Sequence, residues 1–279
     1  MAILKYINNN NKSIELGNAA PFLVTTIDGL GSPQNEIYTQ KSPYQDGVAA
    51  THSSLGPRNI VIEGKIIDSN RENRQAYRYK LLSIFNPKLD GKLIIDLGSA
   101  QRQIDCIVEQ APYFSSKAER NYQDFSINLI APNPYWQDIN TTQKEIVTWI
   151  GGISFPLQLP TQFATAGPKI INIINSGDVE TPIRLEVTGT ATNPKILKRL
   201  TGEFIKVNRT LATDDTLVIT TDFGNKRVEQ NGVNVFNYID LNSTFFSLDV
   251  GDNVIELITD DVTDNANIKI SYRNRYLGV

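Results

Sequence analysis

The stretch that decides the fold class lies between Asn172 and Ile239. It reads NIINSGDVETPIRLEVTGTATNPKI over residues 172–196, TGEFIKVN over 201–208 and DTLVITTDFGNKRVEQNGVNVFNYI over 215–239. Apolar and polar residues alternate in short runs, and small polar turns separate these runs. Residue types that carry catalysis are sparse within it. The pattern therefore favours a β-sandwich built for structure or binding rather than for chemistry.

The same pattern extends over the whole second half of the chain. Asn231-Gly232 between two strand-like runs is a strong signal for a hairpin turn. Short strands without a long helix indicate a sandwich or a barrel. We predict strands near residues 145–149, 169–175, 183–189, 195–200, 203–207, 216–220, 226–229, 245–248, 253–259 and 267–272.

The first half combines strands with one helix. The run Arg58–Ile67 alternates apolar and polar residues around Gly64, a candidate bulge site. RENRQAYRYKLLSIFN, residues 71–86, places an apolar stripe at helical spacing, and Asp68 or Ser69 is the expected cap. Further strands are expected over 92–97, 102–109 and 124–130. Strands on both sides of a helix predict an α+β first domain.

A long polar stretch interrupts the first half before Arg58. It reads GSPQNEIYTQKSPYQDG, residues 31–47, with two prolines and the turn Asp46-Gly47. Plain connections in compact domains are shorter, and a segment of this length is either disordered or an interaction arm. We predict a projecting arm over Ser32–Gly47, and we expect residues 49–54, which include His52, to form a loop.

A boundary between two domains is expected at Ala131-Pro132-Asn133-Pro134-Tyr135-Trp136. Two closely spaced prolines stiffen the chain in an extended form and end any regular element. We therefore divide the chain into domains 1–135 and 136–279.

Composition and charge exclude several function classes. The chain has 279 residues, 27 Lys and Arg against 30 Asp and Glu, and a formal net charge of −3. Neither half has the basic excess that nucleic-acid binding requires, so no binding through base contacts is expected. No run reaches membrane-span length, and the first residues lack a signal-peptide core, so we expect neither membrane association nor secretion.

A single cysteine, Cys106, and a single histidine, His52, limit the chemistry further. Cys106 shares a strand face with Ile104 and Val108, which predicts a buried structural thiol. One histidine leaves little material for a Ser-His-Asp triad or a zinc site, so no catalytic residue, metal site or cofactor is predicted.

Carboxylates and aromatic rings leave three alternatives open. The acidic clusters are Asp214-Asp215, Asp249 with Asp252, and Asp260-Asp261 with Asp264. We interpret them as turn residues, with surface calcium and glycosidase catalysis as the alternatives. Aromatic rings that could stack on a sugar are Trp149, Tyr238, Phe245, Phe246, Tyr272 and Tyr276.

The chain resembles the distal tail protein family of siphophages along nearly its whole length. The resemblance in the first half lies in Ile27-Asp28-Gly29-Leu30-Gly31, in Gly56–Gly64 and in Ala131–Trp136. In the second half it lies in Asn175–Asp178, Thr181-Pro182-Ile183, Asn193–Ile196, Thr201–Ile205 and Asn237–Asp240. Each piece is weak alone, and their order and spacing carry the resemblance.

The resemblance implies a mostly β hub protein of the phage tail tip in the virion, assembled in the cytoplasm of the bacterial host. An N-terminal α+β domain forms a hexameric ring, and a galectin-like β-sandwich follows it. The implied partners are other copies of the chain, the major tail tube protein, and the tail-tip lysin or tail-associated protein. Receptor-binding proteins or a host surface glycan are further partners that it implies for host attachment.

A closed ring needs two different complementary surfaces on each subunit. We expect the arm to supply one of them, through Ser32, Pro33, Tyr38, Pro43, Tyr44 and Asp46. The alternative is a carbohydrate-binding adhesion module of a phage or of a tail-like bacteriocin particle. Galectins hold sugar with a His, Arg, Asn and Trp set, and the absence of histidine from the second half argues against inherited sugar binding.

Overall fold

The chain forms two compact units, each with its own hydrophobic core. The computed structural model describes residues 3–116, 121–146, 149–150, 165–166, 169–261 and 263–279. The first unit comprises residues 1–139 and 276–279, and the second comprises residues 140–275. The expected boundary at 135–136 lies a few residues before this division, and no sequence pattern indicated the return of residues 276–279 to the first unit.

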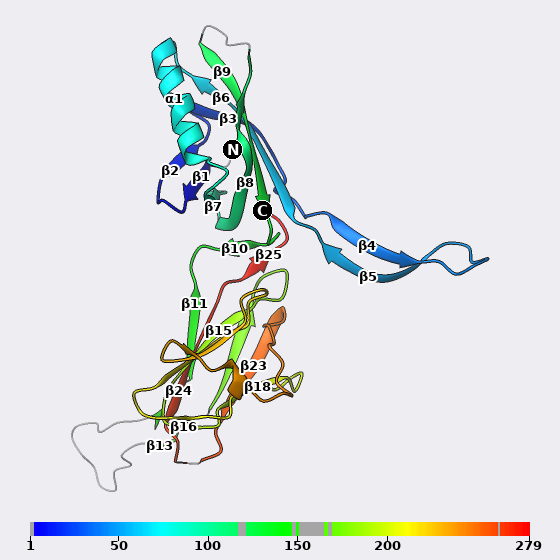
Figure 1. The fold of residues 1–279 in the computed structure, drawn as a ribbon, viewed down its shortest axis with the longest axis vertical. Coiled ribbons are helices and arrows are strands. Elements are labelled where there is room, and N and C mark those ends of the chain that lie inside the picture. Colours follow the sequence, from blue (N-terminus) through cyan, green and yellow to red (C-terminus); the bar gives the residue numbers. More distant parts are fainter. Residues whose placement is uncertain (1–2, 117–120, 147–148, 151–164, 167–168, 262) are drawn as a thin grey trace. The chain divides into compact units, whose positions relative to one another are not determined.

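The first unit is built on one strongly curved antiparallel sheet (Figure 1). Its strand order is β2-β1-β7-β8-β9-β6-β3, and the short strands β10 and β25 join beside β8. An isolated parallel bridge between Gly17 and Leu23 links the two edges of the sheet. The bounds are β1 Ile3–Asn8, β2 Ser13–Leu16, β3 Phe22–Asp28, β6 Arg58–Ile67, β7 Asp90–Asp96, β8 Gln101–Phe114, β9 Tyr122–Ala131, β10 Trp136–Asp138 and β25 Arg275–Tyr276.

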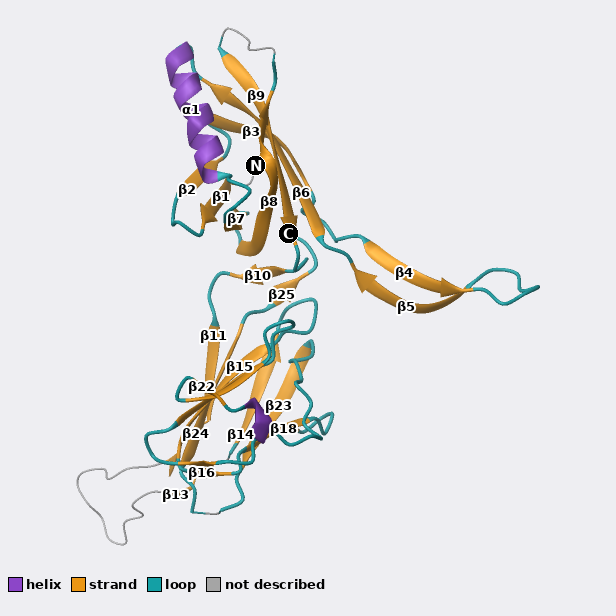
Figure 2. Ribbon diagram, in the orientation of Figure 1, coloured by secondary structure: helices purple, strands orange, loops and turns teal. Residues whose placement is uncertain are grey.

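The helix α1, Arg71–Ile84, packs its buried face on this sheet (Figure 2). Leu81 and Ile84 from α1 and the following Phe85 lie in one cluster with the inward residues of the strands. Asn70 caps the helix, because its side-chain oxygen accepts from the Glu72 backbone N–H at 2.8 Å. The expected caps Asp68 and Ser69 were therefore wrong. Asp68 instead accepts from the backbone N–H of Asn70 at 2.7 Å.

The second unit is a sandwich of two antiparallel sheets. Their orders are β11-β24-β15-β20-β21-β22 and β14-β23-β17-β18. The bounds are β11 Thr142–Ile146, β14 Ile170–Asn175, β15 Ile183–Gly189, β17 Lys195–Lys198, β18 Phe204–Lys206, β20 Thr216–Thr220, β21 Arg227–Gln230, β22 Val233–Asn234, β23 Gly251–Ile258 and β24 Ala266–Tyr272. Two short pairs, β12 (Trp149–Ile150) with β13 (Thr165–Ala166) and β16 (Ala191–Thr192) with β19 (Thr210–Leu211), and the 3₁₀ turn η1 (Phe236–Tyr238) complete it.

The predicted fold class, α+β followed by a β-sandwich, is confirmed. Asn231-Gly232 joins β21 to β22 with φ of 51° and 79°, as the hairpin signal requires. The expected strand at 245–248 was wrong. The chain there contacts its neighbours through isolated hydrogen bonds, such as Thr244 N to Phe204 O at 2.8 Å and Leu248 N to Thr181 O at 2.8 Å.

Candidate functional site

The predicted arm is a β-hairpin that pairs only with itself among the described residues. Strand β4, Asn35–Gln40, runs antiparallel to β5, Ala49–Leu55, with a register shift between Tyr38 and Thr39. Figure 1 shows the pair leaving the sheet of the first unit between β3 and β6. Each strand therefore offers a free edge of N–H and C=O groups, which are ready to pair with another chain.

The side chains of the hairpin are almost all exposed. Ile37, Tyr38 and Val48 are 60%, 51% and 57% exposed, and Tyr44 is fully exposed. The Tyr38 ring stacks on the ring of His52 across the hairpin, with centroids 6.0 Å apart. Apolar side chains gathered on a segment without a core are typical of a surface that another molecule covers.

The structure brings the six predicted contact residues into this one hairpin and its root. Pro33 is buried at the root, next to the exposed Ser32. Tyr38 lies on β4, and the connection between the strands contains Pro43, Tyr44 and Asp46. The predicted loop at 49–54 was wrong, because these residues form β5. A ribbon with no buried face shows no apolar alternation, which is why the strand could not be recognised. Contact of the six residues with another subunit stays a prediction.

Arg58 is a functional candidate that sequence reasoning did not single out. It is the first residue of β6, directly after the arm, and is 2% exposed. Its Nε donates to Pro134 O at 2.8 Å, and its Nη2 donates to Leu277 O at 2.7 Å. Its Nη1 donates to Gly29 O at 2.7 Å and also to Gly31 O. One buried guanidinium thus holds four carbonyl oxygens around the root of the arm.

The signal for Arg58 was present in the alternation of β6. Arg58 shares a strand face with Ile60 and Ile62, which are fully buried. An arginine in register with core isoleucines is forced inward, where it needs internal acceptors. Burial lowers the pKa of its guanidinium, which nevertheless stays charged at any physiological pH.

The cysteine behaves as predicted. Cys106 is 2% exposed and packs among core residues that include Ile104 and Val108. Burial raises the pKa of its thiol to about 12. His52, on β5 of the arm, is exposed and in contact with Tyr38. A buried, protonated thiol is a packing group and not a nucleophile.

Asp215 and Asp261 are turn residues, as interpreted, whereas the turn interpretation was wrong for Asp252, which lies on strand β23. Asp215 accepts from the Ala212 backbone N–H at 2.8 Å and from the Asn231 amide at 2.6 Å, and these bonds lower the pKa of its carboxyl. Asp261 accepts from the Thr263 backbone N–H at 2.8 Å. Comparable bonds hold Asp252 through Asn172, Asp260 through Asn193 and Asp264 through Thr192. No group of three or more potential metal ligands occurs in the described part of the chain.

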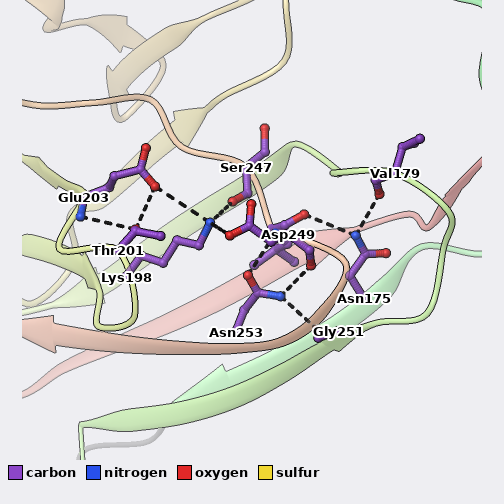
Figure 3. A network of polar contacts seen from close by, with 10 residues as sticks. Asn175, Val179, Lys198, Thr201, Glu203, Ser247, Asp249, Gly251 and Asn253 are labelled. Carbon is purple, nitrogen blue, oxygen red and sulfur yellow. Dashed lines mark hydrogen bonds and ion pairs between the residues drawn. The ribbon is translucent and has the colours of Figure 1, made fainter.

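Asp249 belongs to a polar network in the second unit that is centred on the buried Lys198 (Figure 3). The Lys198 ammonium, on a side chain that is 2% exposed, contacts Asp249 at 2.6 Å and Glu203 at 3.7 Å. It also donates to Ser247 O at 2.9 Å. Asn253 binds the backbone of the same loop, accepting from Asp249 N at 2.9 Å and donating to Asp249 O at 2.8 Å. The network fixes the loop before β23 against the turn between β17 and β18.

The aromatic rings proposed for sugar stacking are already engaged or buried. Phe246 and Tyr272 are buried. The Arg209 guanidinium lies over the Tyr238 ring at 4.4 Å, and that of Arg102 lies over Tyr276 at 3.9 Å. Phe245 stacks on Phe236 at 5.6 Å, and the Lys226 ammonium lies 5.5 Å from its centroid. The side chain of Trp149 lies outside the described residues. These contacts occupy part of the ring faces, and Tyr238 stays 42% exposed.

Within the described residues, no helix combines the length and the hydrophobicity needed to span a membrane.

Comparison with known proteins identifies both units. A family model described as the phage tail protein RIFT-related domain matches residues 9–131. A second, described as the siphovirus-type tail component, C-terminal domain, matches residues 176–276. None of the curated protein sequences matches the chain.

Two solved structures share the fold over almost the full length. One is the SPP1 Dit (gp 19.1) protein, described as a paradigm of the hub adsorption apparatus in phages that infect Gram-positive bacteria. It matches with a TM-score of 0.72, 13% identity, and 98% of both chains covered. The other is a chain of the phage P2 baseplate in its activated conformation with calcium, with a TM-score of 0.52, 12% identity and 100% of both chains covered.

The arrangement is thus an α+β unit with an exposed hairpin, followed by a galectin-like sandwich, and each unit matches its own tail-protein model. The two tail-protein models together cover most of the chain, which therefore belongs to the distal tail protein family of siphophages.

Proposed function

We propose that this protein is the structural hub of a phage tail tip, and that six copies join in a ring. The ring connects the major tail tube protein to the tail-tip lysin or tail-associated protein and to receptor-binding proteins. It is assembled in the host cytoplasm and acts in the virion. Family membership supports the hub role, and both solved structures with this fold come from phage hub or baseplate assemblies.

The exposed arm is the observation that supports the proposed ring. A hairpin with two unpaired edges and four exposed apolar side chains has no partner within its own subunit among the described residues. A ring is built from heterologous contacts, in which one surface of a subunit meets a different surface of the next. The arm offers both strand pairing and apolar contact for one of these two surfaces.

The role is structural and not catalytic. The thiol is buried, the single histidine stacks on a tyrosine, and Asp215 and Asp261 accept hydrogen bonds within their own turns. A sugar-binding role draws no support from the aromatic side chains described above, and we do not propose it as a second function.

We further propose that the chain consists of two domains, residues 1–135 and 136–279, that fold independently. Each unit has a separate core, one centred on β1, β6–β9 and α1, the other on the two sheets of the sandwich. Calorimetry of the full chain should then show two unfolding transitions, and a single cooperative transition would contradict the proposal.

The ring is tested by removing the arm at its closed root. The Gly56 backbone N–H donates to Gln34 O at 3.0 Å, so a two-residue Asn-Gly turn between residues 34 and 56 can replace Asn35–Leu55 and keep the root closed. Light scattering should show a hexamer for the full chain and a monomer for the deletion. A hexamer formed by the deletion variant would refute the arm's role, and a monomeric full chain at tens of micromolar would refute the ring.

A further inference from the structure

The hairpin arm has little to fix its direction except its root. Residues of β4 and β5 are exposed, and the two strands pair only with each other among the described residues. The two extended strands are attached to the unit at one end only. The contacts at that end therefore determine the direction of the hairpin and the position of its tip. The root consists of Gly29–Gly31, where the chain enters the arm, and Gly56–Arg58, where it returns.

Arg58 ties three separate chain segments together at this root. Gly29 O and Gly31 O belong to the entry of the arm. Pro134 O belongs to the segment that leads into β10 and onward to the second unit. Leu277 O belongs to the segment that returns from the second unit. Both covalent connections to the second unit and the arm therefore share one buried cation.

Further contacts close to Arg58 also stabilise the root of the arm. The Val279 backbone N–H donates to Leu30 O at 3.1 Å, so the returning segment binds the arm entry directly as well. Gly29 has φ of 86°, and a β-carbon there would overlap the Asn59 carbonyl. Trp136 lies against the guanidinium, with its ring centroid 5.8 Å from Arg58 Cζ.

The four hydrogen bonds at the root of the arm require an arginine. The guanidinium has five N–H donors in a planar fork, and four hydrogen bonds to carbonyls use it in three directions. A lysine keeps the charge but offers three donors around one atom and cannot span the same carbonyls. No carboxylate pairs with Arg58 among the described residues, so the four carbonyls and the Trp136 ring compensate its charge.

We infer that Arg58 is the positioning residue of the arm: it fixes the direction of the hairpin and couples it to both connections with the second unit. This inference rests on the proposed function, because arm direction matters through ring closure. Displacing residue 134 or residues 277–279 removes an acceptor from a buried cation, so the arm responds to either connection. The coupling is reciprocal, as any coupling between two sites must be.

The experiment measures arm direction apart from ring assembly. Spin labels are placed at Val48→Cys on the arm and Glu15→Cys on β2, both exposed positions of the first unit, with Cys106→Ala as background. Labelled full-length protein is diluted with unlabelled protein, so that only distances within one subunit are read. The parent should give a narrow distribution of distances between the two labels. In Arg58→Lys this distribution should become broad.

Two further variants separate positioning from general damage. Arg74→Lys is the matched control, because Arg74 is also buried in the first unit and donates to a backbone carbonyl, that of Asp68 at 2.5 Å. It should keep the narrow distance. A chain that ends at Tyr276 removes the Leu277 carbonyl with Arg58 intact, and it should broaden the distance as Arg58→Lys does. If Arg58→Lys does not fold, this truncated chain gives the readout.

The outcomes are distinguishable. A narrow distance in folded Arg58→Lys, or in the truncated chain, overturns the inference whatever the state of assembly. Equal broadening in Arg74→Lys overturns it too, since the effect would then be general loosening. A broadened arm with an intact hexamer supports the positioning role of Arg58 and contradicts the proposed role of the arm in the ring.

Discussion

The hydroxyl of Tyr6 occupies the space that a β-carbon on Gly91 would need. The two residues are close neighbours on paired strands, since Tyr6 lies opposite Leu93 and Gly91 lies opposite Asn8. Tyr6 is fully buried, and its ring stacks on Phe85 with centroids 4.3 Å apart. Gly91 is therefore required by the tyrosine that crosses it, and not by its own backbone angles.

Gly91→Ala should destabilise the first unit. The added methyl group forces Tyr6 away from Phe85, and overpacking of this kind costs about 1–3 kcal/mol. Gly17→Ala is the control, because the nearest atom to its β-carbon is Ile3 Cγ1 at 3.9 Å, and its effect should stay within about 0.5 kcal/mol. Urea unfolding followed by fluorescence measures both, and equal stabilities of the two variants would contradict the steric argument.

Stability should fall at alkaline pH because of buried acids in the first core. Burial raises the pKa of the Cys106 thiol from 9.0 to about 12, and burial also raises the pKa of Tyr6. Between these values the unfolded chain loses the thiol proton and the folded chain keeps it, so stability declines as pH rises from 9 toward 12. Below pH 9 this contribution is fully present.

The measurement compares unfolding free energies at neutral pH and at about pH 10. The free energy of unfolding of Cys106→Ala should decline less between these two pH values than that of the parent. The decline that remains in the variant reflects the ionisation of Tyr6. In the native parent the thiol should also resist a thiol reagent at neutral pH. Rapid labelling under native conditions would contradict the burial on which the argument depends.

The Lys198–Asp249 pair should respond unequally to loss of either partner. Lys198 is 2% exposed on its side chain and Asp249 is 57% exposed. Asp249→Ala leaves a buried ammonium with poorer compensation, for which we expect a loss of about 1–3 kcal/mol. Lys198→Met leaves a carboxylate that water can solvate, and its apolar chain fills the same space, so the loss should be smaller.

The thermal unfolding transition of the second unit measures the stability losses of Asp249→Ala and Lys198→Met and so tests which is larger. Arg227→Ala, which removes an exposed pair with Glu229 at 3.8 Å in the same unit, is the control and should change stability by less than about 1 kcal/mol. A larger loss of stability for Lys198→Met than for Asp249→Ala would contradict the expected order.

Polar replacement of the arm's apolar side chains should weaken the ring without unfolding the unit. Ile37→Asp and Tyr44→Ser change side chains that are exposed in the subunit, so the unfolding free energy should change by no more than about 0.5 kcal/mol. Leu97→Asp is a matched control on another exposed apolar residue of the first unit, outside the arm. Analytical ultracentrifugation over a concentration series should show dissociation of the arm variants and not of the control.

The local spacing of apolar and polar residues was sufficient to predict most strands and the helix. Strand β6 and helix α1 follow from alternation and from helical spacing, because each buries one face against a core. The turn at Asn231-Gly232 follows from the backbone angles that these residues tolerate. Strand β5 of the arm could not be recognised in this way, since an exposed ribbon imposes no periodicity on its side chains.

By itself the sequence determined the two-part organisation, the β character of both parts, the presence of an arm and the burial of Cys106, because these depend on the local succession of apolar and polar residues. Only the tertiary structure decided that Arg58 meets Gly29, Pro134 and Leu277. The acceptors are backbone carbonyls, which every residue has, and they lie up to 219 positions from Arg58 along the chain. No pattern of side chains encodes such a contact, and it exists only once the sheet has closed.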